Sequence, residues 1–388
     1  MSQGYVRVDN ETWDRVNEVT DGAANECFQC GTCTATCPFG KFGDEPLSIR
    51  NLVRKAQVGQ DALGDADELY QCLTCRACES QCPRDVDIVD AMLGLRELSF
   101  EDDGAPAELE NALWSVYEQD NPWERPASDR DEWLDAVPDD VDVQVGGQAE
   151  VLYFVGCSPS YDPQLRETPV GIVTLLDAAG VDFTVLGDQE TCCGDVVRQT
   201  GETEFFDELA GLNSNQFAET GADLIITSSP HCADTFASTY DMDAEVRHYS
   251  EYFLELVEEG HLELGSVDGE VTYHDPCYLV RGSESIVDEP RELLSEVNIQ
   301  VTEMTNSGDD ALCCGGGGGN MWLESDGESR LADRRAREAE ETGAEELVTA
   351  CPYCVQNLED GVKKEGSDLA VRDLVTVLLE AYRSKGGS

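Results

Sequence analysis

The cysteines constrain the fold of this chain more than any other residue type. The sequence of 388 residues contains 17 cysteines, and eight of them fall into two runs with the same spacing, Cys-x2-Cys-x2-Cys-x3-Cys-Pro. The runs comprise Cys27, Cys30, Cys33 and Cys37, followed by Pro38, and Cys72, Cys75, Cys78 and Cys82, followed by Pro83. Thiols spaced this closely are typical of metal ligands. The two runs predict two metal centres near the N-terminus.

A disulfide framework is the alternative use of many cysteines. Secreted disulfide proteins are short and have an even number of cysteines, whereas this chain is long and its count is odd. The sequence begins without the charged-then-apolar pattern of a secretory signal, and no apolar run reaches the length of a membrane helix. We therefore expect free thiols in a reducing, cytoplasmic compartment, with at most peripheral attachment to the cytoplasmic face of a membrane.

The charge of the chain excludes one class of partner. Acidic residues outnumber basic residues by 81 to 25, and the formal net charge is −56. A field of this sign repels nucleic acid and anionic lipid. The acids are spread over nearly every segment and do not form a tail, which favours adaptation to high salt, as in a halophile, over an acidic functional surface.

The spacing of the two runs resembles that of bacterial ferredoxins with paired [4Fe–4S] cubane clusters. In those proteins the fourth cysteine of each run binds the other cluster. The resemblance implies one cluster on Cys27, Cys30, Cys33 and Cys82 and another on Cys72, Cys75, Cys78 and Cys37. We expect a helical ferredoxin-like domain over residues 1–104, with helices at 46–56, 61–69 and 87–98.

Residues 105–150 form an acidic segment that we interpret as a packed linker. It carries Trp114, Trp123 and Trp133 on short helical pieces such as 107–119. Three tryptophans can form a docking face for a partner, but more often they anchor a connector to a domain surface. We expect them to be anchors.

From residue 151 the sequence repeats itself. Cys157 recurs as Cys277, the pair Cys192 and Cys193 recurs as Cys313 and Cys314, and Cys232 recurs as Cys354, at offsets of 120, 121 and 122 residues. Strand patterns at 151–155, 183–186 and 224–227 alternate with helical patterns at 168–179 and 203–220. The expected fold class is α+β with α/β elements: a helical two-cluster domain followed by two α/β repeats, 151–266 and 267–388, whose cysteines gather at the carboxyl ends of parallel or mixed strands.

The second repeat carries five cysteines at three loop ends. A tetrahedral zinc ion uses only four ligands, and an adjacent Cys-Cys pair cannot easily point both side chains at one small ion. The set suits a larger, multi-iron group. It consists of Cys277, Cys313, Cys314, Cys351 and Cys354.

At these positions the chain resembles the cysteine-rich CCG domains of heterodisulfide reductase and its relatives. These include the iron–sulfur subunit of anaerobic glycerol-3-phosphate dehydrogenase and iron–sulfur proteins that accept electrons from electron-transfer flavoprotein. The matching segments are 273–278 (Tyr-His-Asp-Pro-Cys-Tyr), 313–317 (Cys-Cys-Gly-Gly-Gly) and 350–354 (Ala-Cys-Pro-Tyr-Cys). The fusion of both domain types is similar to the form of the reductase in which one catalytic subunit carries both.

The resemblance implies that the five cysteines of the second repeat hold a noncubane [4Fe–4S] cluster, at which the reductase cleaves its disulfide. His274 and His231 each stand near a cluster cysteine. Either histidine could relay a proton to a leaving thiolate or only hydrogen-bond the cluster surroundings; we include His274 with the five cysteines in the expected catalytic set. Arg281 near Cys277 could hold an anionic substrate or offset local negative charge.

The first repeat departs from this pattern, because Ser229 stands where the family motif has the first cysteine of Cys-x2-Cys. Four thiols remain, and they could hold one more cluster or be free buried thiols. They are Cys157, Cys192, Cys193 and Cys232. The glycine run at 315–319 lacks the Gly-Lys-Ser/Thr ending of a phosphate loop, so we expect it to let the backbone approach cluster sulfurs closely.

Two functions fit these observations. The first is an electron-transfer oxidoreductase, a subunit of a larger complex, which passes electrons between a flavoprotein dehydrogenase or electron-transfer flavoprotein and a quinone, a membrane cytochrome subunit or another carrier. The alternative is a heterodisulfide reductase that cleaves a disulfide at the noncubane cluster. No strand is followed by Gly-x-Gly-x-x-Gly, so a flavin or nicotinamide must come from a partner. We favour electron transfer, because the altered first repeat weakens the reductase hypothesis. Zinc in all sites disagrees with the two ferredoxin-type runs.

Overall fold

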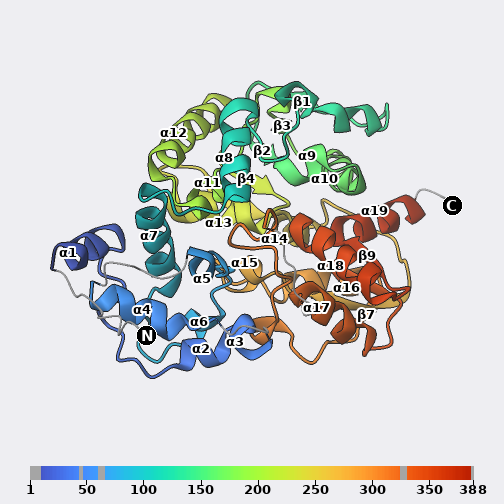
Figure 1. The fold of residues 1–388 in the computed structure, drawn as a ribbon. Coiled ribbons are helices and arrows are strands. Elements are labelled where there is room, and N and C mark those ends of the chain that lie inside the picture. The colour runs from blue at the N-terminus through green and yellow to red at the C-terminus, as the bar shows by residue number, and fades with distance from the viewer. Residues whose placement is uncertain (1–9, 43–46, 60–65, 324–329, 386–388) are drawn as a thin grey trace. The chain divides into compact units, whose positions relative to one another are not determined.

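The computed structural model describes residues 10–42, 47–59, 66–323 and 330–385 (Figure 1). It divides into two compact units. Unit 1 comprises Met1–Leu113 together with two later segments, Val196–Phe206 and Gly315–Leu331. Unit 2 comprises the rest of the chain. Within the described ranges, no helix is both long and apolar enough to cross a membrane.

Short helices surround the two cysteine runs in unit 1. The longest of them, α7, is apolar along most of its length, with Ile88, Met92 and Leu95 buried. The expected helix at 46–56 is present, while most of the one expected at 61–69 lies outside the described residues. The helices are α1 (Asn10–Val19), α2 (Thr32–Thr36), α3 (Pro38–Phe42), α4 (Ile49–Gln57), α5 (Ala66–Tyr70), α6 (Ala77–Ser80), α7 (Ile88–Glu101) and α8 (Ala107–Gln119), which continues into unit 2.

A buried arginine, Arg96 on α7, holds the later segments in unit 1. Its Nη2 donates to the carbonyl oxygen of Cys72 at 2.7 Å, and its Nη1 donates to the carbonyl oxygens of Gln199 at 3.0 Å and Gly318 at 2.9 Å. Gln199 and Gly318 each follow a Cys-Cys-Gly triplet. One side chain thus joins the second cysteine run to the segments that leave both triplets.

Unit 2 contains two all-parallel sheets, in agreement with the repeat found in the sequence. The first has the order β1-β3-β2-β4-β5 and the second the order β7-β6-β8-β9. The strands are β1 (Gln144–Val145), β2 (Val151–Phe154), β3 (Phe183–Val185), β4 (Leu224–Thr227), β5 (Glu245–His248), β6 (Gly269–His274), β7 (Ile299–Val301), β8 (Glu346–Thr349) and β9 (Ala370–Asp373).

The registers show which positions of the two repeats correspond. Phe154, the last residue of β2, pairs with Thr227 of β4. His274, the last residue of β6, pairs with Thr349 of β8. Phe154 and His274 therefore occupy equivalent places immediately before the first cysteine loop of each repeat.

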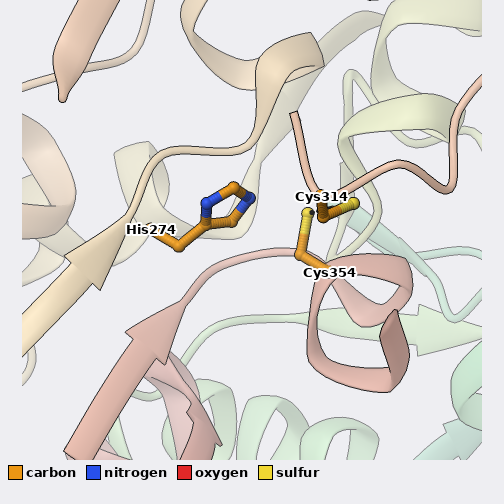
Figure 2. Close-up of side chains that lie close together, drawn as sticks. All are labelled: His274, Cys314 and Cys354. Carbon is orange, nitrogen blue, oxygen red and sulfur yellow. Dashed lines mark hydrogen bonds between the residues drawn. The ribbon is translucent and has the colours of Figure 1, made fainter. Parts of the chain in front are cut away.

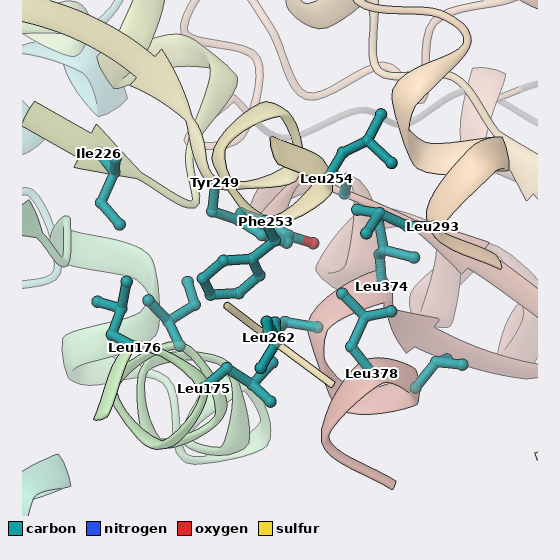
Figure 3. Packing of buried hydrophobic residues seen from close by; sticks show 14 of the residues in the cluster. Leu175, Leu176, Ile226, Tyr249, Phe253, Leu254, Leu262, Leu293, Leu374 and Leu378 are labelled. Carbon is teal, nitrogen blue, oxygen red and sulfur yellow. The ribbon is translucent and has the colours of Figure 1, made fainter. Parts of the chain in front are cut away.

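Helices from both repeats share one hydrophobic core. Leu175 on α10, Phe253 on α14, Leu293 on α16 and Leu378 on α19 belong to it (Figure 3). The tandem repeats thus form one folded unit. The remaining helices are α9 (Cys157–Tyr161), α10 (Glu167–Ala178), α11 (Asp195–Thr200), α12 (Thr203–Thr220), α13 (Pro230–Thr239), α14 (Tyr249–Glu258), α15 (Cys277–Val280), α16 (Glu289–Glu296), α17 (Leu331–Glu340), α18 (Pro352–Glu365) and α19 (Leu374–Lys385).

The tryptophans of the 105–150 segment differ in their environments. Trp133 is 1% exposed in the core, and the ring of Trp123 lies 6.1 Å from that of Tyr353. Trp114 is 60% exposed, with its ring against that of Tyr117. The anchor prediction is therefore wrong for Trp114, because its side chain lies on the solvent side of α8.

The glycine run makes its close approach to the second cysteine run. Gly318 has a φ of +64°, and a Cβ there would collide with the carbonyl oxygen of Cys72 and lie 2.9 Å from the Cα of Leu73. At Gly318 the close partner is thus the backbone of Cys72 and Leu73, and the approach of these glycines to cluster sulfurs stays a prediction.

We predict that Gly318→Ala lowers the thermal stability of the chain much more than Gly366→Ala does. Gly366 also has a positive φ, +70°, but open space around it. The control should cost about 1–2 kcal/mol from backbone strain, and the collision should raise the cost at Gly318 above about 3 kcal/mol. Unfolding followed by circular dichroism measures both. Equal losses would contradict the packing described for Gly318.

Candidate metal centres

Each of two pockets in unit 1 is lined by four cysteines, and each pocket draws on both runs. The first, of about 360 Å³, is lined by Cys27, Cys30 and Cys33 of the first run and by Cys82, the last cysteine of the second. The second pocket, of about 340 Å³, is lined by Cys72, Cys75 and Cys78 and by Cys37, the last cysteine of the first run. The structure thus brings the eight cysteines together in the crossed arrangement.

The same backbone turn directs the thiols of both runs. In the first run, Gln29 and Gly31 have positive φ angles of 65° and 87°. At the equivalent places in the second run, Thr74 and Arg76 have φ angles of 50° and 56°. Non-glycine residues seldom adopt this conformation and pay strain energy for it, which is typical of binding sites. The left-handed residues turn three successive cysteines toward one pocket.

Burial keeps several of these thiols protonated in the absence of a metal. It raises the pKa of Cys37 to about 12, and the nearby Cys72 and Cys75 also act in this direction. Burial likewise raises the pKa of Cys78 well above its ordinary value. Because a metal binds the thiolate, loading such a site releases protons. The positive charge of a bound metal is what makes four adjacent thiolates stable.

The five thiols of the second repeat form one buried group at the carboxyl ends of its strands. The Sγ atoms of Cys277 and Cys313 lie 3.6 Å apart, and those of Cys354 and Cys314 lie 3.5 Å apart. Cys351 interacts with Cys354 and completes the group. None of the five is more than 5% exposed.

The thiols of this group affect one another's pKa. The hydrogen bond with Cys313, together with burial, raises the pKa of Cys277 well above its ordinary value. Hydrogen bonds from Cys313 and Cys354 lower the pKa of Cys314. The group therefore favours a thiolate at Cys314 even before a metal binds.

His274 lies next to this group (Figure 2). Its ring and the sulfur atoms of Cys314 and Cys354 offer ligand atoms that all lie within 4.8 Å of one another. Its Nδ1 accepts a hydrogen bond from Nε of Arg335 at 2.9 Å. Burial, and secondly the charge of Arg335, lower the pKa of His274 well below its ordinary value, so the ring is neutral.

Arg281 has a local structural contact. Its Nη1 donates to the carbonyl oxygens of Asp309 at 2.8 Å and Ala311 at 3.2 Å. These residues directly precede the pair that begins with Cys313. Arg281 therefore orders the loop that presents this pair.

The four thiols of the first repeat are also brought together, beside a buried arginine. The Sγ atoms of Cys193 and Cys232 lie 3.2 Å apart, and Cys157 interacts with Cys192. Nη2 of Arg130 lies 3.4 Å from Sγ of Cys157. The hydrogen bond with Cys192, and then burial, raise the pKa of Cys157, while Arg130 opposes this shift.

Arg130 is itself held by a buried carboxylate. Its Nη1 binds Oε1 of Glu190 at 2.8 Å, and both side chains are 1% exposed. Glu190 also accepts hydrogen bonds from the backbone N–H groups of Val155 and Gly156 at 2.8 and 2.9 Å. The pair fixes a positive charge beside the loop of Cys157.

Ser229 caps a helix in the first repeat. Its hydroxyl oxygen accepts a hydrogen bond from the backbone N–H of Cys232 at 3.3 Å, at the start of α13. The equivalent Cys351 precedes α18 without a side-chain cap bond. The hydroxyl of Ser229 thus provides a helix cap where the second repeat provides a thiol.

Aromatic rings lie between the two thiol groups. The ring of His231 stacks on that of Tyr278 at 4.1 Å and lies 4.9 Å from that of Tyr353. Nδ1 of His231 is 3.2 Å from Oδ2 of Asp195. Burial lowers the pKa of His231, but the hydrogen bond and charge of Asp195 outweigh this effect and raise it to about 9.

Three buried charged residues at these sites, Arg130, Glu190 and Arg335, were not predicted from the sequence. Arg130 and Glu190 are 60 residues apart and belong to no motif, so no sequence signal indicates them. Arg335 stands among several arginines of α17, which is an unusual basic run in so acidic a chain. That run was a visible signal, although it does not show which arginine is buried.

Comparison with known proteins identifies the domains. A model of the 4Fe-4S dicluster domain matches residues 23–86, and a model of the cysteine-rich CCG domain matches residues 151–237 and again 271–359. The predicted order of a two-cluster domain and two cysteine-rich repeats is thereby confirmed. The chain carries [4Fe–4S] clusters.

Several curated proteins are similar over most of the chain. "Probable iron-sulfur-binding oxidoreductase FadF" of Bacillus subtilis is 34% identical over 81% of the chain and 46% of its own length. "EtfAB:quinone oxidoreductase" of Syntrophomonas wolfei is 32% identical over 83% of the chain and 47% of its own length. A subunit of the dihydromethanophenazine:CoB–CoM heterodisulfide reductase of Methanosarcina mazei is 29% identical over 92% of the chain and 93% of its own length.

The chain spans about half the length of the first two of these relatives. Among solved structures, a hypothetical protein from Helicobacter pylori has a similar fold, with a TM-score of 0.54 and 10% identity over 96% of this chain and 75% of that one. The chain thus contains a 4Fe-4S dicluster domain and two cysteine-rich CCG domains, and its relatives include iron–sulfur oxidoreductases and a subunit of heterodisulfide reductase.

Proposed function

We propose that this chain passes electrons between a flavoprotein and a quinone or another carrier, as one subunit of a larger complex. The names of two relatives support this proposal, since one is an EtfAB:quinone oxidoreductase and another an iron-sulfur-binding oxidoreductase. The flavoprotein would be a dehydrogenase or an electron-transfer flavoprotein. A net charge of −56 disfavours direct binding to anionic lipid, so any attachment to a membrane would go through a partner, for example a cytochrome subunit.

The cubane clusters are assigned to the two pockets of unit 1. Each pocket offers four soft sulfur donors, which is the ligand set of a [4Fe–4S] cluster. Each run contributes its last cysteine to the pocket of the other run. This exchange fits a ferredoxin-type pair of clusters better than two separate zinc sites. The proposed ligands are Cys27, Cys30, Cys33 and Cys82 for one cluster and Cys37, Cys72, Cys75 and Cys78 for the other.

The five thiols of the second repeat are assigned to a noncubane [4Fe–4S] cluster, and the four of the first repeat to a further cluster. Five adjoining sulfurs exceed the needs of a zinc ion. The first repeat has one thiol fewer and the buried cation of Arg130 at 3.4 Å from Cys157. Its ligands would be Cys157, Cys192, Cys193 and Cys232.

Burial of the thiols is the observation that carries the proposal. A bound [4Fe–4S] cluster supplies one-electron transfer, which needs no contact between a substrate and sulfur. Cleavage of a disulfide needs such contact, and Cys277 and Cys313 are only 5% and 0% exposed. In unit 1, Cys30 and the nearby Phe28 are exposed, which suits electron exchange with a docked partner.

Arg96 fixes the backbone near the second cysteine run. Arg96 binds the backbone at Cys72 and at Gly318, which follows Cys314 by four residues in the sequence. Within unit 1 this one side chain therefore holds the segment at Gly318 against the second cysteine run. The thiols of unit 2 are themselves buried at the strand ends.

The first prediction tests the crossed ligands by counting iron in double variants. Cys82→Ala should lose the iron of one cluster. Adding Cys30→Ala should cost no more iron, because both residues line the same pocket. Adding Cys75→Ala should remove a second cluster. Iron analysis after anaerobic purification gives the counts, and the reverse order of the two double variants would refute the crossing.

A second prediction separates electron transfer from disulfide reduction. Cluster-complete protein should be reduced by a flavoprotein and oxidised rapidly by a quinone analogue. It should not turn over a disulfide with a low-potential electron donor, because the thiols are buried. Absorbance at the cluster bands follows all three reactions. Steady disulfide turnover by the chain would instead support the reductase hypothesis. The similarity to a heterodisulfide reductase subunit from Methanosarcina mazei is the observation that favours this alternative.

The third prediction concerns Ser229. Ser229→Cys should restore a fifth thiol and make the electron paramagnetic resonance spectrum of the first repeat resemble that of the second. Ser229→Ala is the matched control, since it also removes the α13 cap, at about 1 kcal/mol, but adds no thiol. A spectral change of the same kind in Ser229→Ala would show that the hydroxyl itself contacts the cluster.

A further inference from the structure

The hydrogen bond between Arg335 and His274 determines which ring nitrogen carries the proton. An arginine side chain donates hydrogen bonds and cannot accept them. Nδ1 of His274, at 2.9 Å from Nε of Arg335, must therefore be the acceptor. A neutral imidazole then carries its proton on Nε2, which is free to donate.

That Nε2–H has no protein acceptor. In the part of the chain that the structure describes, Nε2 of His274 is buried without a hydrogen-bond partner, and the residue is 0% exposed. Figure 2 shows the ring beside Cys314 and Cys354, and the three ligand atoms lie within 4.8 Å of one another. A buried donor without an acceptor is unfavourable. The acceptor is therefore expected among the sulfur atoms that this site holds.

Arg335 is fixed in place by other contacts. Its side chain is 0% exposed, and Nη1 donates to the carbonyl oxygen of Asn306 at 2.7 Å and to Oε2 of Glu338 at 2.9 Å. Glu338 in turn accepts from the backbone and side-chain nitrogens of Asn306, both at 2.6 Å. The guanidinium is thus held through Nε and Nη1 and cannot easily turn away from His274.

The first repeat serves as an internal comparison. Phe154 occupies the place of His274, since each ends its strand and pairs with a threonine of the next one, Thr227 or Thr349. A phenylalanine cannot donate a hydrogen bond. At this strand position the five-thiol site therefore has a histidine donor, whereas the four-thiol site has a ring that cannot donate.

We propose that Arg335 holds His274 as an Nε2–H donor to the sulfur atoms of the iron–sulfur centre beside Cys314 and Cys354, and that this hydrogen bond raises the reduction potential of that centre. The inference rests on the proposed function, which assigns an iron–sulfur centre to the second repeat. Hydrogen bonds to sulfur tune such potentials because they stabilise the more negative, reduced state. His274 is then a positioning residue. It is not a metal ligand, which would need a free electron pair on Nε2.

Four variants test this assignment in the full chain. His274→Phe copies the first repeat and removes the donor, whereas His274→Gln retains an N–H group. Arg335→Leu removes the donor to Nδ1, whereas Arg335→Gln retains an N–H donor without the charge. Redox titration followed by electron paramagnetic resonance measures the potential, and hydrogen–deuterium exchange with electron–nuclear double resonance detects the proton near the centre.

We expect His274→Phe and Arg335→Leu to keep their iron but to shift to lower potential. At a given applied potential, the ratio of oxidised to reduced centre should change at least tenfold. For a one-electron couple this corresponds to a shift of about 59 mV in the reduction potential. The exchangeable proton signal should disappear in His274→Phe, and the two glutamine variants should stay near the wild type.

Two results would overturn the proposal. An unchanged potential in His274→Phe at full iron content would show that the hydrogen bond does not act on the centre. Loss of iron from the second repeat in both His274 variants would make His274 a ligand. If the wild-type second repeat contains no iron–sulfur centre, the proposed function itself fails, and this is seen before any variant is made.

Discussion

Close contact between buried sulfur atoms is the constraint on which the structure depends. Pairs such as Cys193 with Cys232, and Cys277 with Cys313, have sulfurs 3.2 and 3.6 Å apart. Adjacent thiolates in a buried site repel one another strongly, so such groups persist only as protonated thiols or around a positive centre. In unit 1 the left-handed turns at positions such as Thr74 carry the backbone strain of this convergence. In unit 2 parallel strands deliver the sulfurs to one end of each sheet.

The two repeats share a fold but place different groups beside their buried thiols. The first places the guanidinium of Arg130 directly beside Cys157 and uses Ser229 to cap a helix. The second places its arginine, Arg335, behind His274, so that a neutral N–H group faces the thiols. These differences suit the proposal that the two repeats hold unlike centres. They also agree with a chain in which the repeats are successive electron sites of different potential.

Local patterns predicted much of this molecule from the sequence. The cysteine spacing indicated both the two-cluster domain and the tandem repeat, and the helix expected at 107–119 has those bounds, because apolar spacing and turn residues act locally. The partners of buried charges depend on tertiary packing instead. Nothing near Arg130 in sequence indicates Glu190, and the apolar character of Trp114 does not show that α8 leaves it at the surface.

The proposed function depends on iron–sulfur clusters bound by the thiol groups. The most direct measurement is the iron and zinc content of protein purified without oxygen, together with its electron paramagnetic resonance spectrum after reduction. We expect several iron atoms per chain, signals of reduced [4Fe–4S] clusters and no more than traces of zinc. Zinc in stoichiometric amounts without iron would contradict the proposed function.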